Sequence, residues 1–457
     1  MHPIVALATP PGTSAIAVIR LSGEGVIDLV DSIFKGKRLA KQVSHSLHFG
    51  SVMAGDEVVD EVVVSLFRGP HSYNGEDTVE ISSHGSPFVV QKIMQTCINA
   101  GARLAEPGEF TRRAFLHGKL DLSQAEAVAD IIASENESQH RLAIKQMRGG
   151  YSDIIESLRQ ELIDFAALLE LELDFSEEDV EFADRKKFLD LIQQMLTVIE
   201  QMICSFQLGN VIKQGIPIAI VGKPNVGKST LLNALLREEK AIVSELAGTT
   251  RDFIEDTLQI HGIQYRFIDT AGIRETTDLL ESKGIERSFE KIRQAEIILY
   301  MADIQESVDT IISDFQSFSF LPEQKVIILL NKSDIGDSNA QQSDSKEVVA
   351  TLSGRRTLEI SAREKRNMDT LISVIEAVSS EQTKRFDFIV SNARHLEAFQ
   401  QAKASLLLVQ KGLQEKMSGD FISIDVRTAL YALGTITGKI SSEDVLSSVF
   451  GRFCIGK

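Results

Sequence analysis

Cysteine is scarce in this sequence, with only Cys97, Cys204 and Cys454 among 457 residues. An odd and widely spaced set does not form a disulfide framework, and no two of the three have the spacing of a zinc site. The sequence is therefore typical of a protein that works in the reducing cytosol, and we expect a cytoplasmic location.

Long apolar runs and targeting signals are also missing. No stretch of 18 apolar residues occurs, so we expect no membrane-spanning helix and no membrane partner. The N-terminal segment MHPIVALATPPG has a short apolar run with no basic segment before it, which favours a strand over a signal peptide.

Positive charge is in deficit. The chain has 48 Lys and Arg against 65 Asp and Glu, a formal net charge of −17. Because phosphates repel such a chain overall, it does not bind nucleic acid through bulk attraction. Any contact with RNA must use a local basic patch or a partner protein.

Proline is absent from a long central segment. None of the nine prolines lies between Pro107 and Pro217, and since proline breaks helix interiors, this gap has room for long helices. Apolar residues near helical spacing, interrupted around 176–184, predict helices separated by a turn. Ser123 and Glu126 are spaced as a capping box at the start of the first helix.

The segments differ in pattern, and 457 residues are too many for one ordinary core. Residues 1–118 have β-rich runs and an expected helix over 87–100, which predicts an α+β domain. Residues 213–380 alternate strand runs with amphipathic segments, which predicts an α/β domain with a parallel sheet. Residues 119–212 and 381–457 are helical in pattern. We therefore expect one helical domain that is interrupted by the α/β domain.

A phosphate-binding loop begins the α/β segment. The apolar run IPIAIV leads into Gly222-x-x-x-x-Gly227-Lys228-Ser229. Glycine lets backbone N–H groups turn toward phosphates, and the helix that follows presents its positive end to the same charge. Lys228 is expected to contact the β- and γ-phosphates in catalysis, and Ser229 to bind Mg²⁺.

A second motif selects the base. Asn331-Lys332-Ser333-Asp334 follows the run KVIILL and resembles the guanine box of Ras-like GTPases. Asp334 can accept two hydrogen bonds from guanine, whereas adenine would leave the carboxylate unpaired. The aliphatic stem of Lys332 can pack along the base. Ser361-Ala362, after the run TLEI, matches the last base-contacting loop.

Two further segments are predicted to contact Mg²⁺ and the γ-phosphate. Asp269-Thr270-Ala271-Gly272 follows the run YRFI. The Asp269 carboxylate is expected to interact with the water ligands of Mg²⁺, and the Gly272 N–H is expected to donate to the γ-phosphate. Upstream, Gly248-Thr249-Thr250 supplies Thr250 as a Mg²⁺ ligand. Ras-like enzymes place a water-positioning glutamine after the glycine, but this chain has Ile273. Either hydrolysis is slow, or another group orients the water.

Several longer runs resemble the MnmE (TrmE) family of tRNA-modifying GTPases. They are ATPPGTSAIAVIRLSG, SYNGEDTVEISSHG, PGEFTRRAFLHGKLDLSQAEAV and the terminal CIGK. The resemblance covers essentially the whole chain. It implies an α/β and α fold: an N-terminal α+β folate-binding and dimerising domain, a helical domain, and an inserted Ras-like P-loop GTPase domain.

The resemblance also implies a function. The chain would be a K⁺-dependent GTPase that forms a homodimer and joins an FAD-containing MnmG-type partner in a heterotetramer-like complex, through which most of the tRNA contact is made. The pair would modify carbon five of the wobble uridine of certain tRNAs, adding an aminomethyl or carboxymethylaminomethyl group. The one-carbon unit would come from 5-formyl- or methylene-tetrahydrofolate. This chain would bind Mg²⁺ and K⁺, and the partner would carry FAD.

Site residues follow from the same resemblance. K⁺ would be bound by Asn225, Ser244, Leu246 and Thr249, and Glu281 would orient the water in place of the missing glutamine. The folate site would use Arg20, Glu80, Lys119 and Lys457, with Cys454 nearby. The predicted nucleotide-binding residues are Asn225, Val226, Gly227, Lys228, Ser229, Thr230, Ser244, Glu245, Leu246, Ala247, Gly248, Thr249, Thr250, Asp269, Thr270, Ala271, Gly272, Asn331, Lys332, Asp334, Ser361 and Ala362.

Simpler roles remain open for some of these residues. The sequence is also consistent with Asn225 as an ordinary loop residue and with Glu281 on a solvated face. Arg20 and Glu80 are also consistent with a structural ion pair at the dimer interface. Cys454 is also consistent with the role of a small buried residue. A lipidated C-terminus is disfavoured, because the residues that follow Cys454 do not match the lipidation signal.

Two other functions compete. A ribosome-assembly or regulatory Ras-like GTPase would need an RNA-binding appendage such as a KH domain, which the helical C-terminal segment lacks. A structural dimer with an idle nucleotide is disfavoured, because the phosphate-loop lysine, both Mg²⁺ ligands and Asp269 are all present.

Overall fold

The computed structural model describes residues 1–174, 184–240, 257–260, 263–268, 293–335, 355–383, 388–451 and 453–456. The chain divides into two compact units. Unit 1 comprises Met1–Ala133, Ala143–Leu196 and Ala398–Lys457, and unit 2 comprises Ser134–Leu142 and Thr197–Glu397. Unit 2 therefore interrupts unit 1 in the sequence, while the predicted boundaries at residues 118, 212 and 380 stay predictions.

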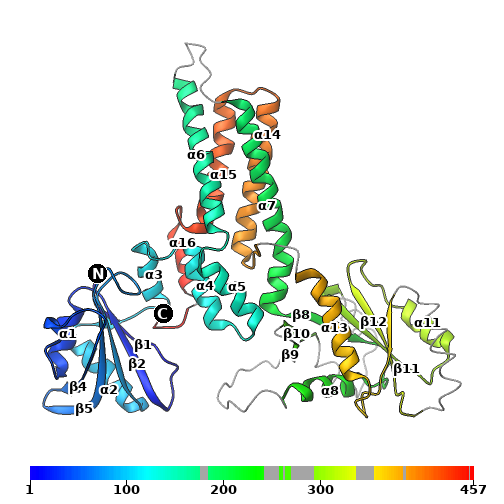
Figure 1. Cartoon of the computed structure of the whole chain (residues 1–457), viewed down its shortest axis with the longest axis horizontal. Coiled ribbons are helices and arrows are strands. Elements are labelled where there is room, and N and C mark those ends of the chain that lie inside the picture. Colours follow the sequence, from blue (N-terminus) through cyan, green and yellow to red (C-terminus); the bar gives the residue numbers. More distant parts are fainter. Residues whose placement is uncertain are drawn as a thin grey trace. The chain divides into compact units, whose positions relative to one another are not determined.

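A mixed seven-stranded sheet forms the first part of unit 1 (Figure 1). Its order is β3-β4-β5-β6-β2-β1-β7, and β1 with β7 is the parallel pair while the other neighbours are antiparallel. The elements are β1 (Ile4–Leu7), β2 (Ser14–Ser22), α1 (Val26–Ile33), β3 (Phe34–Lys35), η1 (Leu39–Lys41), β4 (Ser46–Ala54), β5 (Glu57–Phe67), β6 (Thr78–Gly85), α2 (Pro87–Asn99), β7 (Arg103–Leu104) and α3 (Glu109–Leu116). The predicted β-rich runs and the helix expected over 87–100 are confirmed.

Alternation of side chains along the strands separates two faces of this sheet. Val5 and Ile19 are fully buried in the core that α1 and α2 share with the sheet. Ile4 and Ala6 point to the other face, where they pack with Phe110 of α3. We call these the α2 face and the α3 face.

A buried ionic cluster holds α3 in place. Arg113 is 3% exposed, and its guanidinium lies 2.9 Å from the carboxylates of both Glu109 and Glu76. Glu109 also pairs with Arg103. Burial alone would raise the pKa of Glu109, but hydrogen bonds from Arg103, from the Glu106 backbone N–H and from Arg113 lower that pKa to about 2.

We expect Glu109→Gln to lower the free energy of unfolding by about 3 kcal/mol, because a buried arginine loses a charged partner. The stabilisation by the Glu109 carboxylate is fully present above its ordinary pKa of 4.5 and is lost as the pH falls toward 2. The variant should lack that acid-dependent loss. Urea unfolding at about pH 7 and about pH 3 measures both effects.

The control for this prediction is Glu137→Gln. Glu137 forms an exposed ion pair with Arg141 at 3.3 Å, and such pairs contribute under about 1 kcal/mol. Equal destabilisation by the two substitutions would contradict the role of the buried cluster.

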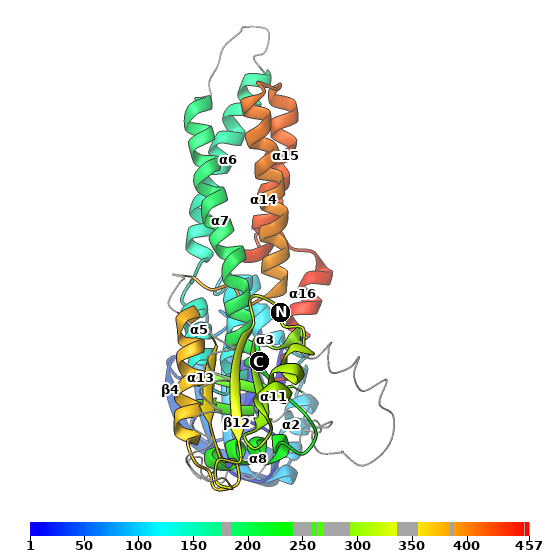
Figure 2. The ribbon, with the colours of Figure 1, turned by 90° about the vertical axis from the view of Figure 1, so that its right-hand side faces the viewer.

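Long helices follow the sheet. In Figures 1 and 2, α6, α7, α14 and α15 lie side by side, and the rings of Phe165 and Phe188 stack between α6 and α7 with centroids 4.8 Å apart. The helices are α4 (Leu122–Ala133), α5 (Glu137–Met147), α6 (Ser152–Asp174), α7 (Arg185–Gln214), α14 (Ala393–Gln414), α15 (Gly419–Thr437) and α16 (Glu443–Phe450). The predicted break near 176–184 falls between α6 and α7 and, apart from Asp184, lies outside the described residues.

By length and composition alone, α7 could cross a membrane. Its side chains Phe188, Ile192 and Met195 are fully buried within the structure. A core helix of a folded protein meets the same criterion, so α7 is weak evidence for a membrane partner.

The start of α4 corrects one prediction. The Asp121 carboxylate accepts from the Gln124 N–H at 2.7 Å, and the Gln124 side chain accepts from the Asp121 N–H at 2.9 Å. This is a capping box, but it begins two residues before the predicted pair Ser123 and Glu126. Ser123 is fully buried inside α4, where its hydroxyl donates to the Asp121 carboxylate at 2.7 Å and lies 2.6 Å from that of Ser152.

A six-stranded sheet forms the middle of unit 2. Its order is β13-β12-β11-β8-β10-β9, parallel except for β10 with β9. The cluster that includes α8 and α13 covers one face, and α11 packs on the other. The elements are β8 (Ile216–Val221), α8 (Lys228–Lys240), β9 (Thr257–Ile260), β10 (Ile263–Phe267), β11 (Ile297–Asp303), α11 (Val308–Gln316), β12 (Lys325–Asn331), β13 (Arg356–Glu359) and α13 (Met368–Thr383). The predicted α/β pattern is confirmed, and the carboxyl ends of the five parallel strands, β13, β12, β11, β8 and β10, meet at one edge.

Candidate functional site

The loop between β8 and α8 has the backbone that a phosphate-binding loop requires. Gly222 and Gly227 have φ values of +139° and +104°, and Asn225 between them has +63°. A Cβ on Gly222 would lie 2.1 Å from the Met301 carbonyl oxygen, so only glycine fits there. The loop leads directly into the N-terminus of α8, where backbone N–H groups and the helix dipole favour a phosphate.

Lys228 is the first residue of α8 and folds back over this loop. Its ammonium donates to the carbonyls of Gly222 at 2.7 Å and Lys223 at 2.6 Å. Burial lowers the pKa of Lys228, and the charge of Asp314 opposes that shift. Ser229 follows in the same helical turn, so the predicted Mg²⁺ ligand and the predicted catalytic lysine lie at one place.

Asn331 joins three loops through one buried amide. It ends β12 and is 4% exposed. Its Nδ2 donates to the Val226 carbonyl at 2.7 Å, and its Oδ1 accepts from the Ala362 N–H at 2.9 Å. A Cβ on Gly227 would lie 2.4 Å from the same amide nitrogen. The phosphate loop, the guanine box and the Ser361-Ala362 loop are therefore held together.

Asp334 lies on the exposed side of the guanine box. The hydroxyl of fully buried Ser361 donates to its carboxylate at 2.6 Å, and this hydrogen bond is the main reason that the pKa of Asp334 is lowered. The carboxylate is thus ionised at neutral pH, as an acceptor of guanine hydrogen bonds must be. The Lys332 ammonium pairs with Asp303 at 2.6 Å.

The rest of the predicted nucleotide site lies outside the described residues. These positions are Ser244, Glu245, Leu246, Ala247, Gly248, Thr249, Thr250, Asp269, Thr270, Ala271, Gly272 and the predicted catalytic Glu281. The described structure therefore brings together the phosphate-loop and base-recognition residues, while the remaining roles stay predictions.

A second predicted site lies on the α3 face of the unit 1 sheet. Arg20 and Glu80 oppose each other across β2 and β6 and form an ion pair at 2.8 Å. The Arg20 guanidinium lies 5.5 Å from the ring centroid of Tyr73 and 5.8 Å from that of Phe110. The Tyr73 hydroxyl is 2.9 Å from that of Thr111. The ion pair forms and stays partly exposed beside two rings, and both its structural role and its role in folate binding stay predictions.

The C-terminal motif returns to the first strand. Ile455 bridges to Pro107, and a Cβ on Gly456 would lie 2.3 Å from the Leu7 carbonyl oxygen. Leu7 belongs to β1, which pairs with β2, the strand of the ion pair. Cys454 is exposed, so the alternative of a small buried residue is wrong.

Lys119 lies near the turn that contains Tyr73. A Cβ on Gly75 would lie 3.3 Å from the Lys119 Cε. The last predicted folate residue, Lys457, lies outside the described residues.

Two family models match the chain. One, described as the GTP-binding protein TrmE N-terminus, matches residues 3–119, and the other, described as the MnmE helical domain, matches residues 122–454. The tRNA modification GTPase MnmE of Christiangramia forsetii is 49% identical over 468 residues, which cover 99% of each chain. This chain belongs to the MnmE family. The MnmE proteins of Flavobacterium johnsoniae and Bacteroides thetaiotaomicron are 49% and 48% identical, again over 99% of each chain.

Membership of the MnmE family confirms the expected fold class, with a TrmE-type N-terminal part, a helical part and a P-loop GTPase part. It also confirms the enzyme class, a GTPase of tRNA modification. The roles of individual residues in this MnmE family member stay predictions.

Two acids of the MnmE nucleotide site were not predicted. Asp303 holds Lys332, and Glu306 holds Lys223 of the phosphate loop at 2.8 Å. Both acids end or follow β11 in the run MADIQE. A carboxylate after a buried strand is the signal that could have found them, because neighbouring parallel strands end at the same edge.

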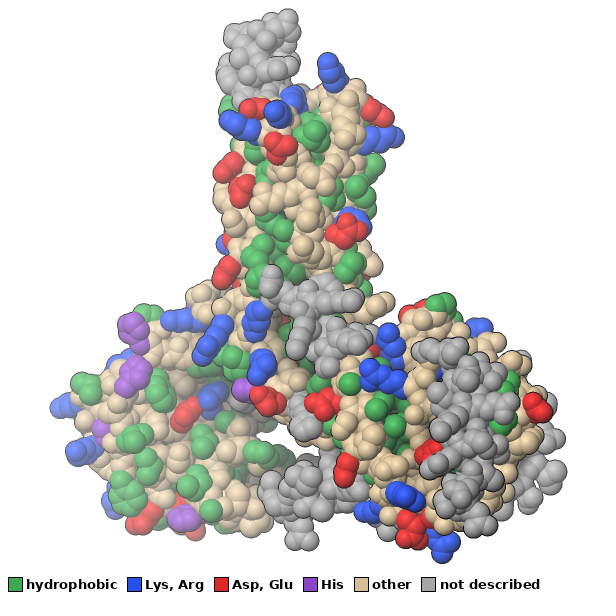
Figure 3. Space-filling model, turned by 45° about the vertical axis from the view of Figure 1, so that its right-hand side comes forward, with side chains coloured by type: hydrophobic (Ala, Val, Ile, Leu, Met, Phe, Trp, Pro, Cys, Tyr) green, Lys and Arg blue, Asp and Glu red, His purple; other side chains and the backbone are tan. Residues whose placement is uncertain are grey.

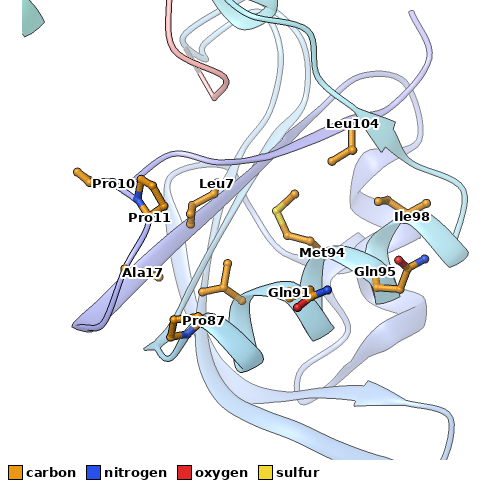
Figure 4. A pocket seen from close by; sticks show the side chains of 12 residues that line it. Leu7, Pro10, Pro11, Ala17, Pro87, Gln91, Met94, Gln95, Ile98 and Leu104 are labelled. Carbon is orange, nitrogen blue, oxygen red and sulfur yellow. The ribbon is translucent and has the colours of Figure 1, made fainter. Parts of the chain in front are cut away.

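The N-terminal sheet of this MnmE chain also has a cavity of ≈ 390 Å³ on its α2 face (Figure 4). Side chains of α2, Met94 among them, point toward Leu7 and the prolines that follow β1. The lining is mostly apolar, with Gln91 and Gln95 as its amides. The predicted folate residues Arg20 and Glu80 lie on the α3 face, so this cavity is separate from them.

Proposed function

We propose that this chain hydrolyses GTP in a K⁺-dependent reaction and, with an FAD-containing MnmG-type partner, modifies carbon five of the wobble uridine of certain tRNAs. The added group is aminomethyl or carboxymethylaminomethyl, and its one-carbon unit comes from 5-formyl- or methylene-tetrahydrofolate. The observation that supports the GTPase part best is the buried amide of Asn331, which holds the phosphate loop beside the guanine box. Family membership supports the rest.

The residues of the phosphate loop suit a nucleotide with bound Mg²⁺. Gly222 and Gly227 have no room for a Cβ beside Met301 and Asn331, and their positive φ values let the loop backbone turn its N–H groups toward phosphates. Lys228 contacts the β- and γ-phosphates, and Ser229 with Thr250 holds Mg²⁺, which offsets the phosphate charge.

K⁺ would be held by Asn225, Ser244, Leu246 and Thr249. A cation at that place supplies positive charge where the phosphates become more negative in the transition state. Asn225 supports this assignment, because it is exposed in the phosphate loop, one residue before buried Val226.

Glu281 would orient the attacking water, because Ile273 occupies the position of the usual glutamine. A carboxylate can accept a proton or a hydrogen bond from that water, which an isoleucine cannot do.

Arg20, Glu80, Lys119 and Lys457 would bind the tetrahydrofolate. Cations suit its carboxylates, and a carboxylate suits its N–H donors. The partly exposed ion pair of Arg20 and Glu80 supports this site, as does the return of the C-terminal motif with Cys454 to β1.

Self-association is supported by exposed apolar side chains on the α3 face. Leu47, Phe49 and Ile16 are 70%, 68% and 63% exposed, and by register they share the face of Arg20 and Glu80. Figure 3 shows hydrophobic side chains on the surface of the N-terminal part. A second copy of the chain would cover them, giving a cytoplasmic homodimer that binds the MnmG-type partner, with tRNA bound mostly through that complex.

Mass analysis of wobble uridines in cells that lack this protein tests the proposed reaction. We expect the carbon-five group to disappear from the affected tRNAs and to return when the wild-type chain is restored. Lys228→Ala should not restore it, because that chain cannot bind the phosphates productively. Unchanged wobble uridines would refute the tRNA reaction while leaving the family assignment intact.

Replacing KCl by NaCl at constant ionic strength should reduce GTP turnover by about tenfold or more, because a site lined by carbonyls and phosphate oxygens fits Na⁺ less well than K⁺. Nucleotide affinity, measured in both salts, is the control and should change much less. Equal turnover in the two salts would remove the cation from the mechanism.

A further inference from the structure

Unit 2 has a hollow of its own at the amino ends of its strands, away from the nucleotide loops. Its volume is ≈ 380 Å³, and it lies between the segment before β12, the start of β13 and α13. Lys325 begins β12, and Arg355 and Arg356 precede and begin β13. These three cations line the hollow together with Phe320 and Val378.

The three cations form no ion pair within the described part of the chain. Lys325, Arg355 and Arg356 are each exposed. The chain as a whole has a net charge of −17. A hollow with three cations is therefore the kind of local basic patch through which such a chain can hold a polyanion.

Aromatic rings fix one of these cations. The Arg355 guanidinium lies 4.8 Å from the ring centroid of Phe315 and 5.5 Å from that of Phe320. Stacking of this kind holds the guanidinium plane without neutralising it. A fixed, charged guanidinium is suited to the oxygens of a phosphate, to which it can donate two hydrogen bonds.

We propose that this hollow binds backbone phosphates of RNA, and that the RNA is the tRNA substrate of this family member. Lys325, Arg355 and Arg356 contact phosphodiester oxygens, and Phe320 offers an apolar surface beside them for a base or ribose. RNA is favoured over a protein partner because three clustered cations beside an aromatic ring match the charge density and stacking groups of a nucleic acid. The strands β12 and β13 connect this hollow rigidly to the guanine box and the Ser361-Ala362 loop.

The test uses the full-length protein and a fluorescently labelled tRNA transcript with uridine at the wobble position. The triple variant Lys325→Ala, Arg355→Ala, Arg356→Ala is compared with Lys37→Ala, Lys41→Ala, Lys186→Ala, which removes the same charge from exposed positions elsewhere. We expect the first variant to raise the Kd for tRNA about tenfold or more and to lower the slope of log Kd against log salt concentration by about three, because three fewer phosphates release counterions. The control should stay within about twofold of wild type.

A second measurement does not depend on the folding of a variant. In the wild-type protein, bound tRNA should protect Lys325, but not Lys37, from an amine-reactive reagent read by mass spectrometry. Equal losses of tRNA affinity in the two triple variants, or no protection of Lys325, would overturn the proposal. Protection of Lys325 by inorganic pyrophosphate but not by tRNA would also overturn it, because the hollow would then be a site for small anions.

Discussion

Replacing Asp334 with asparagine should make the protein prefer xanthosine nucleotides to GTP. In the predicted guanine box the ionised carboxylate would accept two hydrogen bonds from guanine donors, whereas the amide would place a donor of its own at one of those positions. Xanthine has a carbonyl there and restores the match. Sites built around such hydrogen bonds reject a mismatched base by up to about 10⁴-fold. Because Asp334 is exposed, we expect GTP affinity to fall by about a thousandfold.

The measurement is the Kd for GTP, XTP and ATP in the wild type and in Asp334→Asn. The matched control is Asp369→Asn, an exposed acid in the first turn of α13, which should leave the order of affinities unchanged. The hydrogen bond from Ser361 supports the role of Asp334, because it orients the carboxylate before the base binds. Equal hydrolysis of ATP and GTP by the wild type would refute the guanine box.

Glu281→Ala should preserve GTP affinity and abolish most turnover. If Glu281 acts on the water and not on the nucleotide, its removal raises the energy of the transition state alone, so kcat falls while ground-state binding stays. Loss of a group that positions water or accepts its proton costs about a hundredfold or more. Single-turnover hydrolysis and nucleotide binding, both in K⁺, separate the two effects.

Glu286→Ala, five residues further along the same charged stretch, is the control for Glu281 and should hydrolyse GTP at close to the wild-type rate. A collapse of nucleotide binding in Glu281→Ala would show a structural role. Restoration of turnover by Glu281→Gln would favour orientation of the water over proton transfer, because glutamine can accept a hydrogen bond but is not a base.

The phosphate loop could be predicted because its backbone conformation requires glycine at fixed positions. Gly222 lies so close to the Met301 carbonyl that the residue type is fixed by the geometry, and the motif therefore identifies the structure. Asn331 was predicted as part of a base-binding motif. Its link to Val226 and Ala362 is a contact between distant segments, which a local pattern does not contain.

Other features depend on contacts that no single segment shows. The sequence at the start of α4 fits two overlapping capping boxes, and the Asp121–Gln124 box forms while the Ser123 hydroxyl instead contacts that of Ser152, from a helix that a local pattern does not include. Lys325 and Arg356 are far apart in sequence, and the parallel pairing of β12 with β13 brings their ends together. The ionised Glu109 likewise depends on Arg103 and Arg113 together, so neither its burial nor its pKa follows from one spacing.

The pairing of α6 with α15 has a consequence for synthesis of the protein. The two helices pack closely although they come from opposite halves of the chain, with the larger part of unit 2, Thr197–Glu397, between them. On the ribosome α6 is made long before α15, so its apolar face stays uncovered and prone to aggregation until α15 is made. A stop codon placed just before Gly419 would therefore leave the first half of the bundle without its partner. Loss of a short C-terminal segment should be as damaging to accumulation of the protein as an early truncation.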